Sequence, residues 1–317
     1  MTGIRIGTRR SPLALQQTQA VAAALQQRYP GLTLQVVPIE TGGDRNTDAA
    51  LSSLGGTGVF TREIEAALQG CVCDLAVHSM KDLATAMPDG LVLGAVLQRE
   101  DPRDAFISPF GTLSALPRGA VVGTSSLRRR AMLGRLRPDL EVVNLRGNVH
   151  SRLRAAGIDI DGGRLPSRKL DGTFLALAGL RRLGLDGHAT QVLDPSLFLP
   201  APAQGAIAVQ LREDDASLMD LVAFLDHDAT RRSVTAERAF LQVMEGGCQL
   251  PLGALAQVED DGGIHLFAMV LTLDGAEHVE GDERGTIPQS VGEALAHRLL
   301  AAGGDAILAR VKNELRR

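Results

Sequence analysis

The amino-acid sequence predicts an α/β protein of about two or three domains, built on parallel or mixed β-sheets. Strand-like and helix-like stretches alternate through the first two thirds of its 317 residues. That alternation is typical of sheets whose strands are connected by helices. The hydrophobic content of 44% is ample for packed cores, and the length exceeds that of one ordinary domain.

The first α/β unit begins at the N-terminus. Alternating or continuous apolar runs predict its strands, and apolar residues at helical spacing predict its helices. Ser11 followed by Pro12 is typical of a helix start, because serine caps the first turn and proline fits the first helical position. The expected elements are a strand at Ile4–Gly7, a helix at Pro12–Arg28, a strand at Leu34–Ile39, a helix at Arg62–Gln69 and a strand at Leu75–His78.

A second unit starts at about Asp104 and ends where the prolines of Pro200–Ala203 break the pattern. Beyond about Ser217 a third region follows. The second unit is expected to contain a strand at Val121–Gly123, a helix at Ser126–Leu136, a strand at Glu141–Asn144, a helix at Val149–Ala156, a strand at Phe174–Ala178 and a helix from Leu180. A strand at Ala206–Gln210 precedes the third region, where we expect a helix at Thr235–Met244, strands within Leu250–Val258 and Ile264–Leu273, and one long helix near Ser290–Leu315.

The charge is unevenly distributed along the chain. The net charge is −4, but Arg99 to Arg182 contains fifteen Arg and one Lys against eight acidic residues. From Leu218 to Arg317, the sequence contains nine basic and sixteen acidic residues. A basic segment inside an acidic protein favours a local site for a small polyanion over nucleic acid. The aromatic content of 3%, with no Trp, also argues against base stacking.

Three cysteines and the absence of a signal-like or membrane-spanning run predict a cytoplasmic protein. Cys71 and Cys73 form an isolated Cys-x-Cys pair, and His78 lies nearby. Zinc sites normally draw four ligands from two such clusters or from added histidines. We therefore expect structural cysteines and no metal site.

Two polar loops in the first unit follow predicted strands, where open α/β sheets bind ligands. Arg9 and Ser11 stand at a predicted helix start, which suits a carboxylate or phosphate; a simple cap beside surface arginines is the alternative. Lys81 and Asp82 follow the next buried strand. The lysine could hold an anionic substituent while the aspartate stabilises positive charge. An exposed ion pair is the alternative there.

Two loops in the basic unit repeat this plan. Thr124–Ser126 and the arginines at 128–130 provide hydroxyls, backbone N–H groups and guanidiniums for an anion. Arg146 follows the next strand, and we expect it to bind the same anion. Arg152 and Arg154 could belong to the site or form a solvated charge stripe on a helix.

Cys248 follows two glycines at a predicted corner between a helix and a strand. The glycines leave room for a bulky group against the main chain, which would make the thiol accessible. A buried cysteine after a helix stop is the alternative.

Taken together, seven motifs resemble the porphobilinogen deaminase family, also called hydroxymethylbilane synthases, in order and over nearly the whole chain. They are TRRSPLAL (8–15), HSMKD (78–82), REDPRDAF (99–106), GTSSLRR (123–129), RGNV (146–149), QGA (204–206) and EGGCQ (245–249). The resemblance implies three domains, of which the first two resemble type II periplasmic-binding-protein lobes and the last is a smaller α+β domain. The implied boundaries are 1–98 with 200–213 for domain 1, 99–199 for domain 2 and 214–317 for domain 3.

The resemblance further implies a monomeric transferase that joins four porphobilinogen molecules, with loss of ammonia, into the linear tetrapyrrole hydroxymethylbilane. Its primer would be a dipyrromethane cofactor on a thioether to Cys248. Loss of ammonia leaves an electron-poor azafulvene cation, and Asp82 is the expected catalytic carboxylate. The implied cofactor-binding residues are Cys248, Lys81, Asp82, Thr124, Ser125, Ser126, Arg128, Arg129 and Arg146, and the implied substrate-binding residues are Arg9, Ser11, Arg146, Arg152 and Arg182.

Two departures from the family pattern stand out. Ser53 and Thr57 in the glycine loop replace frequent lysines, which weakens the charge of an expected lid, and the chain around 157–169 is longer than expected. Two alternatives to the enzyme remain. A two-lobed protein that binds an organic anion would not need Cys248, and an inactive paralogue would not need Asp82, Cys248 and the arginines together.

Overall fold

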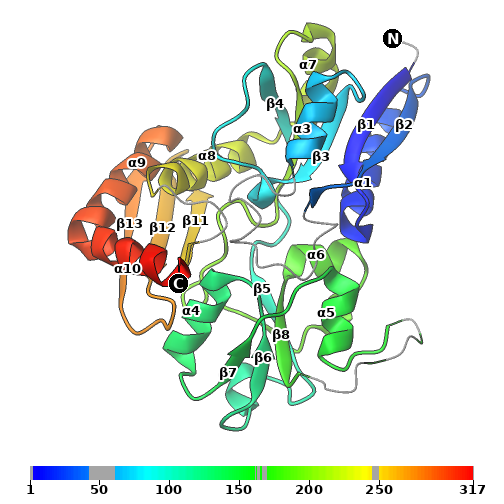
Figure 1. Cartoon of the computed structure of the whole chain (residues 1–317). Helices are drawn as coiled ribbons and strands as arrows, with labels where there is room; N and C mark the ends of the chain where they lie inside the picture. The colour runs from blue at the N-terminus through cyan, green and yellow to red at the C-terminus, as the bar shows by residue number, and fades with distance from the viewer. Residues whose placement is uncertain are drawn as a thin grey trace.

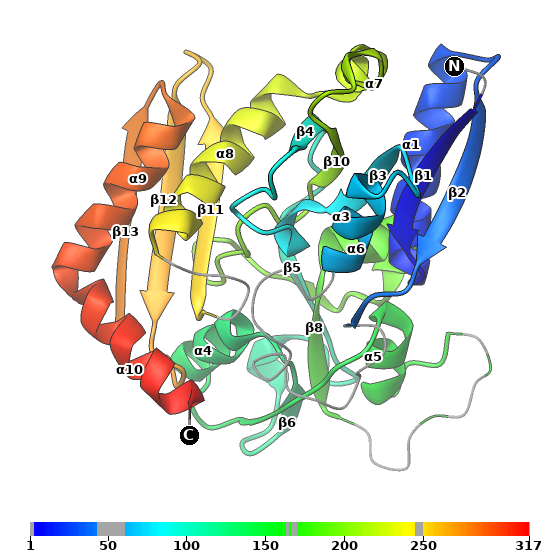
Figure 2. The same cartoon turned by 45° about the horizontal axis from the view of Figure 1, so that its top comes forward.

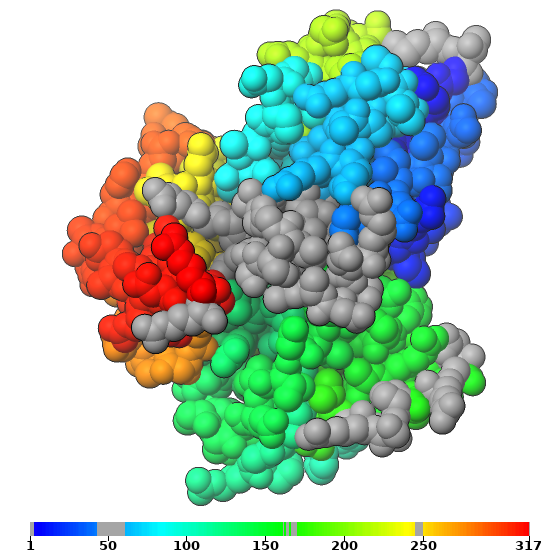
Figure 3. Space-filling model, in the orientation of Figure 1, coloured from blue at the N-terminus to red at the C-terminus, as the bar shows by residue number. Residues whose placement is uncertain are grey.

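In the computed structural model the described residues are 3–42, 61–160, 162, 165, 170–244 and 250–316. They form three sheets, each with its own helices (Figure 1). In Figure 3 the blue to cyan part and the green part form two halves, and the yellow to red part lies beside them. The predicted α/β class and the separate, smaller C-terminal unit are confirmed.

The first sheet has five strands in the order β2-β1-β3-β10-β4. β1 runs parallel to β2 and β3, whereas β10 is antiparallel to β3 and β4. Ile4, Ile6, Val21 and Leu25 share its apolar core, which explains the predicted periodicities. The elements are β1 (Gly3–Arg9), α1 (Pro12–Arg28), β2 (Thr33–Ile39), α3 (Arg62–Gln69), β3 (Leu75–Ser79), the 3-10 helix η2 (Met80–Asp82), β4 (Leu91–Val96) and β10 (Ile207–Arg212).

The second sheet repeats this arrangement in the order β7-β6-β8-β5-β9. β6 is parallel to β7 and β8, and β5 is antiparallel to β8 and β9. The elements are β5 (Asp104–Ile107), η3 (Leu113–Ala115), β6 (Val121–Gly123), α4 (Leu127–Leu136), β7 (Glu141–Val143), α5 (Val149–Ala155), β8 (Gly172–Ala176), α6 (Leu177–Arg182), η4 (Asp186–His188) and β9 (Gln191–Val192).

The chain crosses between the two sheets twice, once between β4 and β5 and once between β9 and β10. The second crossing returns the chain to the first sheet. The resemblance implies such a segment near Pro200–Leu211, where the chain returns to domain 1. The domain boundaries at 98/99, 199/200 and 213/214 stay a prediction.

The third sheet is antiparallel, and helices α8, α9 and α10 pack beside it (Figure 2). Met269 and Leu271 of this sheet join a core that includes Met132 and Leu133 of α4, so the third unit packs against the second. Its elements are α8 (Asp228–Val243), β11 (Leu252–Val258), β12 (Ile264–Leu271), β13 (His278–Gly285), α9 (Pro288–Leu299) and α10 (Asp305–Leu315). Two short helices that precede α8, α7 (Ala216–Val222) and η5 (Ala223–Leu225), pack instead in the core of the first sheet.

The prediction of a single long helix near Ser290–Leu315 is wrong. A wide helical turn at Leu300–Gly304 separates α9 from α10, and Gly303 has φ 108°. Glycine adopts this left-handed conformation without a Cβ clash, so the chain can change direction there. The sequence prediction also lacked β4, β5, β9, α7 and β13. No helix of the described part of the chain is both long and apolar enough to cross a bilayer.

Candidate active site

One pocket brings together the loops that follow β1 and β3. Because these strands are parallel neighbours, with Ile6 opposite Leu75, their carboxyl ends open on the same edge of the sheet. Arg9, Ser11, Lys81 and Asp82, all predicted as site residues, line this pocket. The other lining residues are Leu13, Ala14, Gln17, Thr61, Val77, His78 and Ser79.

Helix α1 begins at the wall of this pocket. The Ser11 hydroxyl accepts a hydrogen bond from Ala14 N at 3.3 Å, and Pro12 occupies the first turn, as the sequence predicts. The remaining N–H groups of that turn and the partial positive charge of the helix end favour an anion. Ser11 therefore acts first as a helix cap, and the pocket gains a helix N-terminus.

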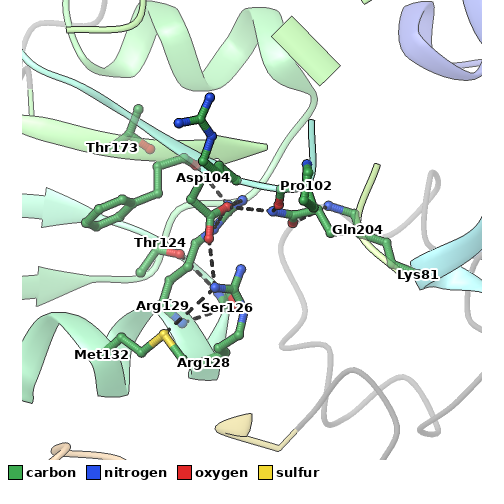
Figure 4. Close-up of polar contacts among 12 residues, drawn as sticks. Lys81, Pro102, Asp104, Thr124, Ser126, Arg128, Arg129, Met132, Thr173 and Gln204 are labelled. Carbon is green, nitrogen blue, oxygen red and sulfur yellow. Dashed lines mark hydrogen bonds and ion pairs between the residues drawn. The ribbon is translucent and has the colours of Figure 1, made fainter. Parts of the chain in front are cut away.

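Lys81 reaches from the pocket toward the second crossing. Its Nζ donates to Gln204 Oε1 at 3.3 Å (Figure 4). Burial lowers the pKa of the Lys81 ammonium to about 8, although the neighbouring Asp82 carboxylate opposes this shift. The expected alternative of an exposed ion pair does not describe this part-buried lysine.

The start of α4 carries the predicted hydroxyl cluster. Ser126 caps the helix by accepting from Arg129 N at 3.4 Å, and Thr124 Oγ1 accepts from Ser126 N at 3.2 Å. Ser125 lies between them and is partly exposed. The local turn that the sequence predicts is therefore present and is fixed by its own hydroxyl groups.

Arg128 and Arg129 are buried and share an internal carboxylate, Asp104, at the start of β5 (Figure 4). Arg128 Nη1 lies 2.7 Å from Asp104 Oδ2, and Arg129 Nη2 lies 2.6 Å from Asp104 Oδ1. Burial alone would raise the pKa of the Asp104 carboxyl, but the two guanidiniums outweigh it and hold that pKa well below its usual range. Both arginines thus have a structural partner that the sequence-based prediction of ligand binding did not include.

Two carbonyl groups complete the support of these arginines. Arg128 Nη1 also donates to Leu199 O at 2.7 Å, and Arg129 Nη1 donates to Phe174 O at 2.9 Å. Among the buried side-chain atoms that the structure describes, Arg128 Nε is without a hydrogen-bond partner. This donor is unsatisfied within the described part of the protein, so it is available to a bound group.

Gln204 connects this ion-pair cluster to Lys81. Its buried amide donates to Pro102 O at 2.7 Å and to Asp104 Oδ1 at 3.1 Å, while its oxygen accepts from Lys81. A continuous polar path therefore runs from Lys81 through Gln204 to Asp104. The QGA motif was identified in the sequence, but no role was assigned to this glutamine.

Arg152 lies within electrostatic range of both halves. Its Nε donates to Gly147 O at 2.9 Å. The pKa of the Arg152 guanidinium is lowered to about 10, mainly by burial and further by the positive charges of Arg129 and Arg146, while the Asp82 carboxylate opposes the shift. Arg152 therefore lies within electrostatic range of Arg129, Arg146 and Asp82, and the excess of positive charge there favours an anionic ligand.

Arg182 on α6 reaches the second crossing. Its Nη2 donates to Gly205 O at 2.5 Å, and burial lowers the pKa of its guanidinium. Gly205 has φ 94°, and a Cβ there would lie 2.3 Å from Glu100 O. Only glycine fits where the two crossings touch, which is the backbone reason for the QGA motif.

Glu237 on α8 was missed by the sequence prediction. Its fully buried carboxylate lies 2.6 Å from Arg99 Nη1 and accepts from Ala203 N at 2.5 Å and Ala256 N at 2.8 Å. It thereby joins both crossings to the third sheet. The sequence did contain a signal, because Glu237 lies beside the apolar helix positions 236, 239 and 240. An acidic residue on a buried helix face indicates a buried ion pair, since a buried charge needs a partner.

Several predicted features lie outside the described residues. They are Cys248 with its EGGCQ motif, Ser53 and Thr57 of the glycine loop, and most of the extra stretch at 157–169, of which 157–160, 162 and 165 are described. Cys71 is exposed and Cys73 is buried. Burial raises the pKa of the Cys73 thiol to about 11, which suits the predicted structural role.

Known protein families match nearly the whole chain. Residues 4–220 match the family model described as porphobilinogen deaminase, dipyromethane cofactor binding domain, and residues 231–301 match that of the porphobilinogen deaminase C-terminal domain. A curated relative named porphobilinogen deaminase from Carboxydothermus hydrogenoformans is 43% identical over 98% of this chain and 97% of its own. One of the same name from Moorella thermoacetica is 46% identical over 98% and 97%.

Solved structures of two binding proteins are also similar to this chain. The methionine-binding protein MetQ has a TM-score of 0.44 and 14% identity, covering 78% of this chain and 96% of its own. The aliphatic sulphonate binding protein SsuA from Escherichia coli has a TM-score of 0.39 and 16% identity, covering 77% and 71%. The two family models and the full-length relatives establish that the chain belongs to the porphobilinogen deaminase family.

Proposed function

We propose that this protein joins four porphobilinogen molecules head to tail, with release of ammonia at each bond, and frees hydroxymethylbilane by hydrolysis. The observation that carries this proposal is the meeting of cations from both halves of the molecule around Asp82. Arg9 and Lys81 share a pocket with Asp82, and Arg152 is within electrostatic range of Asp82, Arg129 and Arg146. A growing chain of pyrroles carries acetate and propionate groups, which such a cluster would bind.

The described residues fit a covalent dipyrromethane, which would supply the free pyrrole carbon onto which the first substrate molecule is joined. The cationic cluster matches its carboxylates, and the unsatisfied Arg128 Nε is a buried donor beside the site. Arg128 and Arg129 also hold Asp104, so ligand binding there would use their remaining N–H groups. The residues we propose to hold it are Cys248, Lys81, Asp82, Thr124, Ser125, Ser126, Arg128, Arg129 and Arg146.

The protein's own groups would bind, orient and move protons. Arg9, Ser11, Arg146, Arg152 and Arg182 are the proposed substrate-binding residues, and their guanidiniums would fix the carboxylates of the incoming pyrrole. The Asp82 carboxylate would accept a hydrogen bond from a pyrrole N–H and stabilise the positive charge that develops when ammonia leaves. It would then take the proton released from the ring carbon.

The intact mass of the purified protein, with Ehrlich's reagent as a second readout, tests this function. We expect an adduct of two linked pyrroles, a positive colour reaction, and turnover of porphobilinogen. The variant Cys248→Ala is expected to have the bare polypeptide mass. Bare mass and no turnover in the unmodified sequence would contradict the function, and normal loading of Cys248→Ala would contradict the attachment site.

Asp82→Asn tests the proposed catalytic carboxylate. We expect it to keep the cofactor mass and lose turnover by about 10²- to 10⁴-fold, the usual range for a general acid or base. Asp89→Asn, an exposed residue seven positions along the same segment, is the matched control and should keep full turnover. Near-normal turnover of Asp82→Asn would remove Asp82 from this role.

We also propose a cytoplasmic monomer that does not act on nucleic acid. The low aromatic content and the confinement of excess positive charge to residues 99–182 support the last point. The alternative of a non-enzymatic anion-binding protein or an inactive paralogue is not favoured, since relatives 43% and 46% identical over nearly their whole length are named as the enzyme.

A further inference from the structure

The chain directly after Asp82 is irregular. Asp82 is the last residue of η2, and residues 83 to 88 belong to no helix or strand. Backbone carbonyls in such a segment cannot be satisfied by a helix or a sheet ladder and need other donors. The position of Asp82 therefore depends on what holds this segment.

Arg238 of α8 supplies three such hydrogen bonds. Its Nη1 donates to Leu83 O at 3.0 Å, and its Nη2 donates to Ala84 O at 2.6 Å and Thr85 O at 3.1 Å. A guanidinium is planar and has donors spread over a fixed fork, so one side chain can fix three consecutive carbonyls. A lysine ammonium is a compact donor and cannot match that spread.

Helix α8 is itself held firmly relative to the rest of the molecule. Glu237, the neighbour of Arg238, binds Arg99 and the N–H groups of Ala203 and Ala256. Val234, one turn earlier, packs in a core that includes Met80 and Leu83. The helix therefore gives Arg238 a fixed base from which to hold the segment after Asp82.

We propose that Arg238 is a positioning residue that sets the place of Asp82 relative to α8. The helix ends at Val243, and Cys248 follows five positions later in the sequence. Arg238 thus relates the proposed catalytic carboxylate to the helix that leads to the proposed attachment thiol. This inference rests on the proposed function, because it assigns Arg238 a role in that same reaction.

The same helix offers a matched control. Arg231 lies seven positions before Arg238 and also donates to carbonyls of the first unit, Leu93 O at 3.4 Å and Gly94 O at 3.3 Å. Those carbonyls belong to β4, away from Asp82 along the chain. Arg231 also binds the Asp226 carboxylate, with Nε 2.6 Å from Oδ2. If both arginines only held α8 to the first unit, Arg231→Lys would therefore be at least as damaging as Arg238→Lys.

The test compares Arg238→Lys and Arg231→Lys as holoenzymes whose cofactor content is measured by intact mass. We expect Arg238→Lys to lose about 10- to 100-fold in kcat, the scale of a misplaced catalytic group, with KM for porphobilinogen within about twofold. Arg231→Lys should keep both constants within about twofold. Unchanged kcat in Arg238→Lys, equal losses in both variants, or a change confined to KM would overturn the proposal.

Hydrogen exchange of residues 82–88 provides a readout that does not depend on turnover. We expect faster exchange there in Arg238→Lys and not in Arg231→Lys, and unchanged exchange would also overturn the proposal. If Arg238→Lys does not fold, Arg238→Gln, which keeps two amide donors, is judged by the same criteria. Turnover by the unmodified protein in parallel separates the two hypotheses, since its absence contradicts the proposed function and its presence leaves the variants to decide on Arg238.

Discussion

The amide oxygen of Gln204 lies 3.3 Å from the ammonium nitrogen of Lys81, which joins the second crossing to the segment that carries Asp82. The same amide donates to Asp104, the carboxylate that holds Arg128 and Arg129. The lysine of the first unit and the two arginines of the second are therefore connected through one buried side chain. We propose that this connection sets the spacing between the cations that bind the ligand.

Gln204→Met is expected to slow cofactor uptake by the apo-protein. The substitution keeps the side-chain length and removes the hydrogen bonds to Lys81, Pro102 and Asp104, at a cost of about 1–3 kcal/mol for each buried group left unpaired. Uptake is followed by intact mass after addition of porphobilinogen. Thr272→Val is the control, because Thr272 is also buried but its hydroxyl bonds to Asp274 and Glu277 of the third unit. Equal uptake rates in the two variants would contradict the role of Gln204.

Asp104→Asn is expected to reduce the free energy of unfolding by about 3–5 kcal/mol, because it leaves two buried guanidiniums without their carboxylate. Glu277→Gln, which breaks the exposed pair with Arg310, should cost less than about 1 kcal/mol. Urea unfolding of both variants measures the difference. Similar losses in the two would show that the Asp104 cluster is not a buried ion-pair network.

The Asp104 contribution also has a defined pH dependence. Its folded pKa lies below the unfolded value of about 4, so the stabilisation is fully present above that pH and is lost as the pH falls through the folded pKa. Unfolding of Asp104→Asn should therefore depend less on pH below about 4 than that of the unmodified protein. Parallel acid-unfolding curves would contradict this expectation.

Cofactor uptake by the apo-protein is expected to fall as the pH rises through about 8, where the Lys81 ammonium loses its proton. The contribution of Lys81 to the free energy of unfolding changes in the opposite direction with pH. Because the folded pKa is below the unfolded value of about 10.4, the unfolded chain binds more protons between these values and stability rises with pH. Lys81→Arg, which stays charged, should keep its uptake rate above pH 8. If the uptake rate of Lys81→Arg falls above pH 8 as it does in the unmodified protein, deprotonation of Lys81 is not the cause of that fall.

Stability should also fall between about pH 6.5 and 4 because of His78. Burial lowers the pKa of this histidine from 6.5 to about 4, so the unfolded chain binds more protons in that window. The loss at pH 4 is on the order of 3 kcal/mol. His78→Gln should flatten this part of the stability curve, whereas His278→Gln, at an exposed position, should not. A curve of unchanged shape in His78→Gln would contradict the assignment.

Local signals account for what was predicted correctly. The start of α1 was predicted from Ser11 and Pro12, and the Ser11 hydroxyl does accept from Ala14 N. Ser126 caps α4 in the same way, by accepting from Arg129 N. Apolar periodicity identified most strands and helices. The terminal helix failed because apolar spacing continues through Gly303, whereas the backbone turns there.

The site was predicted only in part, because local sequence patterns do not show which distant residues become partners. Arg9, Ser11, Lys81 and Asp82 were identified from loops at strand ends, and parallel pairing of β1 and β3 does bring them together. Arg128 and Arg129 were predicted as ligand-binding residues, but Asp104 lies 24 and 25 positions away in the sequence. No local pattern indicated that pairing.

The sequence by itself determined the α/β class, the helix starts, the basic segment and the motif set, because these depend on periodicity, capping and composition over a few residues. Only the tertiary structure decided the partners of Gln204, Glu237 and Arg238, which lie 123, 138 and 155 positions from Lys81, Arg99 and Leu83 respectively. Such contacts depend on where segments far apart in the sequence meet in the fold. Burial there makes each polar group require a partner, and the folded path of the backbone decides which partner is in reach.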